Sequence, residues 1–558
     1  MNASRVDPDL LGTVRAWLAE DPDPATAEEL SALLQKAQSG DAGAAAELAD
    51  AFDGTLQFGT AGLRGRLGPG SNRMNRVVVA RAAAGLAAYL ASGGGRSVVV
   101  GYDARRNSDV FAHDTARIMA GAGLNAMVLP TRMPTPVLAF AIRELGCDAG
   151  VMVTASHNPP EDNGYKVYLG DGSQIVAPAD TEISAHIAAV GPITSIPVSE
   201  AYTVLDGAVL DAYVARVVSL LADGPRAVSV VYTAMHGVGG EVFIRAAREA
   251  GFPEPRRVAA QFDPDGLFPT VSFPNPEEPG AMDLALAEAR ACGADLIVAN
   301  DPDADRCAVG IRCDGDYRML TGDEVGALLG WWIVERGRRD GSPARGVYAE
   351  SIVSGTLLER IATSAGLGFA TTLTGFKWIS RVPELRFGYE EALGYCVDPA
   401  AVKDKDGISA ALLMLEMVAA LSAEGRGPQH VLDDLARRFG LHATGQLSVR
   451  VSDVSLIADA MARLRADPPS SLGGRDVQRI DDLERGGEGL PPTDGLRFML
   501  RDARVIVRPS GTEPKLKCYL QVVVPVDGDS PGDIQNAKMV AQAELAALRA
   551  GIAEILDL

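Results

Sequence analysis

The stretch G-V-M-V-T-A-S-H-N-P-P, residues 150–160, decides how the rest of the chain is interpreted. Its first four residues are apolar and predict a short buried strand, and residues 154–160 form a polar loop. The loop carries the hydroxyl of Ser156 and the imidazole of His157, and Lys166 follows shortly after. Enzymes present nucleophiles in this way, on a rigid loop at the end of a strand. We therefore predict that Ser156 is a nucleophile.

The segments around this strand alternate between strand and helix patterns. Strands are predicted at residues 98–100 and 126–129, and helices at residues 114–123 and 135–145. Strands separated by helices of about ten or more residues pair in parallel through right-handed crossovers. The alternation restarts near residue 227 and again near residue 322, which predicts three successive α/β units. Their further expected elements are strands at 227–232, 295–299 and 346–349 and helices at 241–250, 281–292, 322–336, 356–365 and 408–421.

The two ends of the chain differ from this pattern. Residues 8–52 are rich in Ala, Leu and Glu at helical spacing and predict a helical extension. After about residue 440 we expect a smaller α+β unit with strands at 445–451, 503–507 and 516–524 and a closing helix at 534–556. The Gly- and Pro-rich residues 470–494 are expected to form a surface insertion. The expected domains are residues 1–52, 53–205, 206–318, 319–440 and 441–558.

The composition narrows the class of protein. The 558 residues include 73 acidic and 52 basic side chains, a net charge of -21, which disfavours binding to nucleic acid or to an anionic membrane. An anionic ligand then requires a local basic site. The six cysteines form no C-x-x-C pair and are expected to be buried thiols in a reducing compartment. With no leader pattern and no apolar run of about 18 residues, we expect a cytoplasmic protein without membrane partners.

A second motif, D-P-D-A-D-R at residues 301–306, follows the predicted strand at 295–299. Three alternate carboxylates in an extended loop would point the same way and repel one another unless a cation lies among them, and all-oxygen ligands suit Mg²⁺. A calcium-binding loop would need Gly and Glu at its sixth and twelfth positions, where this chain has Arg306 and Arg312. A solvated acidic turn is the other alternative.

Two further loops could bind a phosphorylated sugar. In R-P-S-G-T-E-P, residues 508–514, a guanidinium, two hydroxyls and a glycine could cradle a phosphate, although an ordinary hairpin turn has the same residues. In G-Y-E-E-A-L-G, residues 388–394, Glu390 and Glu391 could accept hydrogen bonds from sugar hydroxyls, or they could begin a solvated helix. Nothing near Ser156 suggests a hydrolase triad, and a serine can instead carry a phosphoryl group.

The chain resembles the α-D-phosphohexomutase superfamily of phosphoglucomutases and phosphomannomutases. The resemblance rests on four motifs in the same order, T-A-S-H-N-P-P, D-P-D-A-D-R, the Glu-Glu loop and R-P-S-G-T. The forms G-T-A-G-L-R-G (59–65), T-G-F-K-W-I (374–379) and K-D-K-D-G (403–407) are similar to the branch that contains phosphopentomutases and glucose-1,6-bisphosphate synthases. The resemblance implies an α/β fold of four domains around a central cleft, three of them similar mixed-sheet domains and the fourth α+β.

The resemblance also implies roles for individual residues. Ser156 would be phosphorylated and would share Mg²⁺ with the three aspartates, while Arg64, His157 and Lys166 would act in phosphoryl and proton transfer. Residues of the other loops would bind the substrate. The complete implied set is Ser156, Arg64, His157 and Lys166 for catalysis, Ser156, Asp301, Asp303 and Asp305 for the metal, and Arg306, Thr374, Lys377, Glu390, Glu391, Lys405, Arg508, Ser510, Gly511 and Thr512 for the substrate.

The expected activity is therefore a phosphosugar mutase, a monomer or dimer, that interconverts glucose 1-phosphate and glucose 6-phosphate and uses a sugar 1,6-bisphosphate activator. Many phosphoglucomutases have Ser after the paired glutamates, where this chain has Ala392. Mannose phosphates and ribose phosphates are therefore kept as alternative substrates. A regulator that binds sugar phosphates without turnover, and a phosphatase that uses Ser156, are the alternatives from other classes.

Overall fold

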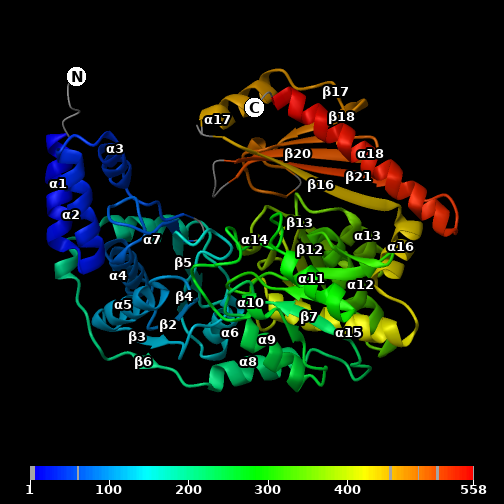
Figure 1. Ribbon diagram of the computed structural model, residues 1–558, viewed down its shortest axis with the longest axis horizontal. Coiled ribbons are helices and arrows are strands. Elements are labelled where there is room, and N and C mark those ends of the chain that lie inside the picture. The colour runs from blue at the N-terminus through cyan, green and yellow to red at the C-terminus, as the bar shows by residue number, and fades with distance from the viewer. Residues whose placement is uncertain (1–6, 60–61, 452–454, 488, 511–514, 557–558) are drawn as a thin grey trace. The chain divides into compact units, whose positions relative to one another are not determined.

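The computed structural model describes residues 7–59, 62–451, 455–487, 489–510 and 515–556. The chain divides into two compact units (Figure 1). Unit 1 comprises residues 1–319 and 394–419, and unit 2 comprises residues 320–393 and 420–558.

Three helices open unit 1, where the sequence pattern predicts helices: α1 (Pro8–Glu20), α2 (Pro24–Gln38) and α3 (Ala42–Ala51). Each begins after an aspartate whose carboxylate accepts a hydrogen bond from a backbone N–H of the first turn. The proline at the first position of α1 and of α2 already has the φ that a helix requires. Val14, Leu30 and Leu48 are fully buried in a small core that also includes Val77.

The first sheet of unit 1 has the strand order β1-β5-β4-β2-β3-β6. Its strands are β1 (Gly62–Arg66), β2 (Ser97–Tyr102), β3 (Asn125–Val128), β4 (Ala149–Val153), β5 (Asp162–Leu169) and β6 (Thr203–Val204), and its helices are α4 (Arg76–Ser92), α5 (Ser108–Gly121), α6 (Thr135–Glu144) and α7 (Ala179–Ala188), followed by the short helix η1 (Ile193–Ser195). β2 pairs in parallel with β3 and β4, as predicted. β5 runs antiparallel to β4, and β1 antiparallel to β5. The chain therefore turns directly from the serine loop into β5.

The second sheet of unit 1 has the order β11-β10-β9-β7-β8. Its strands are β7 (Val230–Thr233), β8 (Arg256–Arg257), β9 (Leu296–Ala299), β10 (Ala308–Cys313) and β11 (Asp316–Met319), with helices α8 (Ala208–Val218), α9 (Gly240–Glu249), α10 (Ala259–Phe262) and α11 (Asp283–Cys292). β7 is parallel to β9, whereas β10 is antiparallel to β9. The aspartate motif is thus the tight connection between two antiparallel neighbours. Strand β15 (Gly394–Cys396) and most of helix α15 (Gly407–Ala423) also belong to unit 1.

Unit 2 begins with a third group of parallel strands, in which β12 (Val347–Ser351) pairs with β13 (Gly368–Thr372) and β14 (Leu385–Glu390). The helices of this part are α12 (Gly322–Arg339), α13 (Leu357–Ser364), α14 (Phe376–Ile379) and α16 (Pro428–Phe439). α12 begins at a capping box, in which the Thr321 hydroxyl accepts from the Glu324 N–H and the Glu324 carboxylate accepts from the Thr321 N–H.

A six-stranded antiparallel sheet of order β16-β21-β20-β19-β18-β17 closes unit 2. Its strands are β16 (Leu441–Arg450), β17 (Ser471–Leu472), β18 (Arg475–Asp482), β19 (Leu496–Leu500), β20 (Ala503–Pro509) and β21 (Lys515–Val524), with helices α17 (Ser455–Ala466), η2 (Leu483–Arg485) and α18 (Pro531–Leu556). The prediction of a surface insertion at residues 470–494 was wrong for β17 and β18, which are members of the sheet. Leu472 and Arg475 pair across Gly473 and Gly474, a two-residue hairpin with positive φ at both glycines.

The structure can be compared with two predictions made from the composition, the burial of the cysteines and the absence of a membrane-spanning segment. Four cysteines are buried as predicted, but Cys292, at the end of α11, is exposed and Cys313, at the end of β10, is half-buried. Within the described residues no single helix is long and apolar enough to cross a membrane. α15 and α16 together meet that criterion as a pair bent by 88°.

Candidate functional site

The predicted nucleophile, Ser156, lies directly after β4 and is buried. Its backbone has a φ of 52°, in the left-handed region that non-glycine residues rarely adopt, and its N–H donates to the Thr154 hydroxyl at 2.8 Å. The Ser156 Oγ donates to Asp301 Oδ2 at 2.8 Å and lies 3.2 Å from His157 Nδ1. The hydroxyl is thus held between a carboxylate and an imidazole.

One arginine fixes the backbone of the serine loop. The guanidinium of Arg105 donates to the carbonyls of Ser156 at 2.6 Å and of Asn158 at 2.5 Å. It also donates to the carbonyls of Pro159 at 2.7 Å and of Asp162 at 3.1 Å. Arg105 is buried, and its charge is balanced by the Asp103 carboxylate, 3.5 Å from its Nε. Four carbonyls held by one planar group leave the loop little freedom to move.

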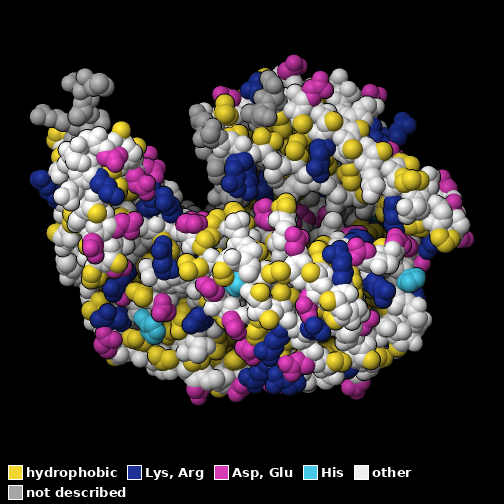
Figure 2. All heavy atoms as spheres, viewed as in Figure 1, with side chains coloured by type: hydrophobic (Ala, Val, Ile, Leu, Met, Phe, Trp, Pro, Cys, Tyr) yellow, Lys and Arg dark blue, Asp and Glu magenta, His cyan; other side chains and the backbone are white. Residues whose placement is uncertain are grey.

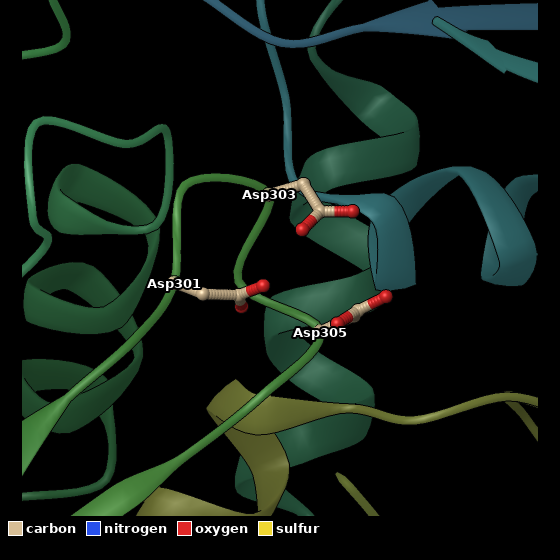
Figure 3. Close-up of side chains that lie close together, drawn as sticks. All are labelled: Asp301, Asp303 and Asp305. Carbon is tan, nitrogen blue, oxygen red and sulfur yellow. The ribbon is translucent and has the colours of Figure 1, made fainter. Parts of the chain in front are cut away.

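The three aspartates of the D-P-D-A-D-R motif converge in space (Figure 3), each with a carboxylate oxygen within 4.8 Å of the others. The loop is a tight turn and not the extended segment that the sequence predicted, because the Ala304 N–H donates to the Asp301 carbonyl and Ala304 has a φ of 55°. All three side chains are buried, which rules out the solvated acidic turn. The strand β10 follows the loop where a calcium-binding loop would have a helix.

Cations from distant parts of the chain compensate two of the carboxylates. Lys166 Nζ on β5 donates to Asp303 Oδ2 at 2.7 Å and to Asp305 Oδ2 at 2.9 Å. Lys405 Nζ lies 3.2 Å from Asp305 Oδ2, and the hydroxyl of Thr135 donates to Asp303 Oδ2 at 2.6 Å. Burial acts to raise the pKa of both carboxyls, but these cations outweigh it and hold both pKa values below the usual range.

The donor set fits a hard divalent cation. Burial, together with the Asp303 and Asp305 charges, raises the pKa of Asp301 well above its usual range, and Arg306, 3.9 Å from Asp301 Oδ2, offsets this only in part. The Oδ1 atoms of Asp303 and Asp305 are buried and have no hydrogen-bond partner among the described residues. Buried carboxylate oxygens without partners, clustered this closely, are the ligands that Mg²⁺ takes.

Two more predicted catalytic residues lie beside the loop. Arg64 is on β1 in register with Gly164 of β5, and its Nη1 donates to Asn158 Oδ1 at 3.1 Å. Burial lowers the pKa of His157 well below the usual range, with further lowering by Arg306 and Arg64, so the imidazole is neutral near pH 7. Arg306 Nε lies 3.9 Å from Asp301 Oδ2 and 4.0 Å from Asp305 Oδ1. Unit 1 therefore gathers the predicted catalytic and metal-binding residues together with Arg306 and Lys405.

The two glutamates predicted to bind sugar hydroxyls belong to unit 2. They lie at the end of β14 and not at a helix start. The Glu391 carboxylate accepts from the hydroxyls of Ser351 at 3.0 Å and of Ser354 at 3.2 Å, and Glu390 Oε1 accepts from the Gly375 N–H at 2.6 Å. A side chain at position 322 would clash with the Glu391 carbonyl, 1.8 Å from an added Cβ, so only glycine allows this approach.

The remaining predicted substrate residues are also in unit 2. Arg508 lies on β20 opposite Lys517 of β21, and its side chain is hydrogen-bonded to Tyr519. The Ser510 N–H donates to the Lys515 carbonyl at 2.8 Å, while Gly511 and Thr512 lie outside the described residues. Thr374 precedes α14 and is half-buried, and the Lys377 ammonium lies 5.6 Å from the centre of the Trp378 ring.

Sequence reasoning missed three residues of the site, Arg105, Asp103 and Thr135. A signal for the first two was present, because D-A-R-R follows the carboxyl end of the predicted strand at 98–100, where ligand-binding loops of α/β sheets lie. Thr135 begins α6, and both its N–H and its hydroxyl bind Asp303. No local pattern distinguishes it from an ordinary helix start.

Comparison with known families gives four matches in chain order. They are described as phosphoglucomutase/phosphomannomutase α/β/α domain I at residues 55–192, domain II at 211–315, domain III at 321–439 and the C-terminal domain at 447–525.

Known proteins match along most of the chain. A probable phosphomannomutase of Haemophilus influenzae is 50% identical over 80% of this chain and 92% of its own length. A phosphoglucomutase of Staphylococcus epidermidis is 34% identical over 85% of this chain and 92% of its own length. The crystal structure of a putative phosphomannomutase from Thermus thermophilus superposes with a TM-score of 0.68 at 26% identity, covering 88% of this chain and 99% of that one.

Proposed function

The chain belongs to the phosphoglucomutase/phosphomannomutase family and is an intramolecular phosphotransferase, and we propose that it moves a phosphoryl group between the 1-hydroxyl and the 6-hydroxyl of a hexose through Ser156. One observation carries the proposal. The Ser156 Oγ contacts Asp301 at 2.8 Å, within a buried cluster of three carboxylates in which the Oδ1 atoms of Asp303 and Asp305 have no hydrogen-bond partner among the described residues. A serine that only caps a turn has no need of such surroundings.

In the proposed cycle the active enzyme carries a phosphoryl group on Ser156. The bond from phosphorus to Ser156 Oγ breaks while a bond to the free hydroxyl oxygen of a sugar monophosphate forms. The neutral imidazole of His157 would take up the proton that leaves the sugar hydroxyl, and its Nδ1, 3.2 Å from Oγ, would return a proton to Oγ. The resulting sugar bisphosphate turns around, and its other phosphate returns to Oγ by the reverse steps. An added sugar 1,6-bisphosphate would restore a phosphoryl group that was lost.

The residues of the carboxylate cluster would hold the metal ion. Asp301, Asp303 and Asp305, with an oxygen on Ser156, would bind Mg²⁺, which when bound supplies positive charge to the oxygens of the transferring group. Arg64 and Arg306 would add charge from the protein itself. Lys166 is already committed to Asp303 and Asp305, so we propose that it orients these carboxylates and stabilises charge.

The residues of unit 2 would bind the part of the substrate that does not react. We propose that Glu390 and Glu391 accept hydrogen bonds from sugar hydroxyls. Glu391 is held in place for this by two serine hydroxyls. The non-reacting phosphate would bind the R-P-S-G-T loop, and the unit 2 residues proposed to contact the substrate are completed by Arg508, Ser510, Gly511, Thr512, Thr374 and Lys377. Lys405 of unit 1 is proposed as a further substrate contact.

For the sugar we propose glucose, and mannose as the second candidate because the relative that is 50% identical is named a probable phosphomannomutase. Because Ala392 stands where many phosphoglucomutases have Ser, a pentose phosphate is also tested as a substrate. The test is a coupled assay of kcat/KM for glucose 1-phosphate, mannose 1-phosphate and ribose 1-phosphate, with and without glucose 1,6-bisphosphate. We expect the highest value for glucose 1-phosphate. A higher value for ribose 1-phosphate would overturn the hexose assignment.

The Ser156→Ala variant tests the role of the serine itself. We expect it to lose turnover and to keep its affinity for sugar phosphate, because the residues proposed to hold the non-reacting part of the substrate are unchanged. Turnover equal to the wild type would remove Ser156 from the reaction. Release of inorganic phosphate by the wild type in excess of isomerisation would show a phosphatase instead.

A further inference from the structure

Unit 2 contains a pocket of about 550 Å³ that the proposed reaction does not use. It lies where β20 begins, whereas the predicted phosphate loop follows the end of the same strand. Helix α13, the last residues of α16 and the first residues of β16 also contribute to its walls. Pockets of this volume accommodate ligands of the size of a metabolite.

The floor of the pocket is a polar network with an unused group. The Thr356 hydroxyl accepts from Gln521 Nε2 at 2.7 Å and lies 3.0 Å from His442 Nδ1, which is 3.2 Å from the same amide nitrogen. Burial lowers the pKa of His442 to about 4, so the ring is neutral at pH 7. Gln521 is 3% exposed, and its Oε1 has no hydrogen-bond partner within the described part of the chain. A buried acceptor of this kind costs free energy until a donor reaches it.

The rim is basic in a protein whose net charge is -21. Arg360 and Arg438 are exposed, and neither forms an ion pair with any residue that the structure describes. Arg504 also lines the pocket, but it is half-buried and donates to the carbonyls of Ile352 and Ser354. Arg360 and Arg438 are therefore the two arginines of the lining whose side chains are exposed. Figure 2 shows Lys and Arg side chains mostly interspersed with Asp and Glu on the visible face. Because Arg360 and Arg438 form no ion pair with a described residue, their guanidinium groups are available to bind an anion.

Apolar side chains complete the lining. Phe439, Leu500 and Val523 line the pocket together with the arginines and Gln521. This combination of groups suits a ligand with an anionic end, a ring and a hydrogen-bond donor.

We propose that this pocket binds a small phosphorylated ring compound, with its phosphate at Arg360 and Arg438 and a ring hydroxyl or amino group donating to Gln521 Oε1. Both sugar phosphates and nucleoside monophosphates have this chemistry. The site is independent of the proposed reaction, because none of its residues belongs to the predicted catalytic, metal-binding or substrate-binding sets.

The test is calorimetric titration of the full-length protein with AMP and, separately, with glucose 6-phosphate. The variants are Arg360→Ala/Arg438→Ala, and Arg345→Ala as the matched control, since Arg345 is exposed in the same unit but does not line the pocket. Both arginines are on the surface, so the double variant should fold and keep its basal mutase activity. A third variant, Gln521→Met, removes the amide while keeping the volume of the side chain.

We expect one probe to bind in the pocket, AMP as a single equivalent or glucose 6-phosphate as a second equivalent beside the one in the active site. The double variant should weaken that binding by about tenfold or more, and Arg345→Ala should leave it unchanged. Gln521→Met should weaken it while leaving its dependence on salt intact, because the arginines remain. Absence of AMP binding together with a single equivalent of glucose 6-phosphate overturns the proposal, as does equal binding by the double variant.

Discussion

Replacing Arg105 by lysine should loosen the serine loop without changing the charge of the protein. The ammonium of lysine is a single group with three donors, and it cannot reach the four carbonyls that the guanidinium binds through Nη1 and Nη2. An ammonium at the position of one Nη atom can keep that atom's two carbonyls, so the two charge-assisted hydrogen bonds of the other Nη atom are lost, each contributing about 1.5 kcal/mol or more. The free energy needed to open the loop should therefore fall by about 3 kcal/mol.

Hydrogen exchange measures this opening locally, which suits a chain of several domains whose global unfolding is not a single transition. The amides of Ser156, Asn158 and Asp162 are hydrogen-bonded within the loop and report on it. A loss of about 3 kcal/mol corresponds to exchange about a hundredfold faster in a peptide that covers residues 154–162. Arg106→Lys is the matched control, because Arg106 is adjacent and exposed.

The kinetic constants of Arg105→Lys distinguish positioning of the serine from binding of substrate. We expect kcat to fall by about tenfold or more, because a misplaced Oγ loses its alignment, and KM to change little. Exchange and kcat both equal to those of the wild type would refute the reasoning. Faster exchange with an unchanged kcat would show that the clamp stabilises the loop but does not set the position of the nucleophile.

Three further outcomes are expected. Arg508→Ala should raise KM for the monophosphate by about tenfold or more, since it removes a charge-assisted contact, and unchanged kinetic constants would take this loop out of the site. Thr135→Val should weaken Mg²⁺ binding in a calorimetric titration by about tenfold, because Asp303 loses the hydroxyl that orients it, while the exposed Thr131→Val should not. The pKa of His442 is about 4, below that of an unfolded histidine, so the unfolded chain binds the proton first and stability falls by up to about 3 kcal/mol as the pH falls from about 6.5 to 4. His442→Gln should show a smaller decrease of the melting temperature over that range, and equal decreases would contradict the assignment.

Local sequence patterns were sufficient to predict the strands and the loops that follow them in two places, where a motif comes directly after a buried strand. The apolar run before Thr154 and the run before Asn300 predicted β4 and β9, and with them the loops that carry Ser156 and Asp301. Residue type also indicated that positive charge would lie among the three carboxylates, and Lys166 and Lys405 supply part of it. The convergence of the carboxylates comes from a tight turn at Ala304, which the sequence pattern did not indicate.

Pairing between distant segments could not be predicted in this way. β5 contains Lys166 at a buried position, where the carboxylates of Asp303 and Asp305, from the loop between β9 and β10 of the other sheet, compensate its charge. Likewise, nothing local tells which of Arg105 and Arg106 is buried. In residues 470–494 the Gly-Gly pair was taken with the surrounding glycines as a loop, although a pair flanked by Leu472 and Arg475 is a hairpin signal.

The ion pairs of Lys166 also bear on the order in which the protein is made. Lys166 and Asp303 are 137 positions apart, and synthesis proceeds from the N-terminus, so all strands of the first sheet leave the ribosome before either partner carboxylate exists. Until then Lys166 lacks the two carboxylates that hold its ammonium in the complete chain. The buried cluster around the serine is therefore assembled only after residues 301–305 have been made, although its serine and its lysine come from a segment that is made much earlier.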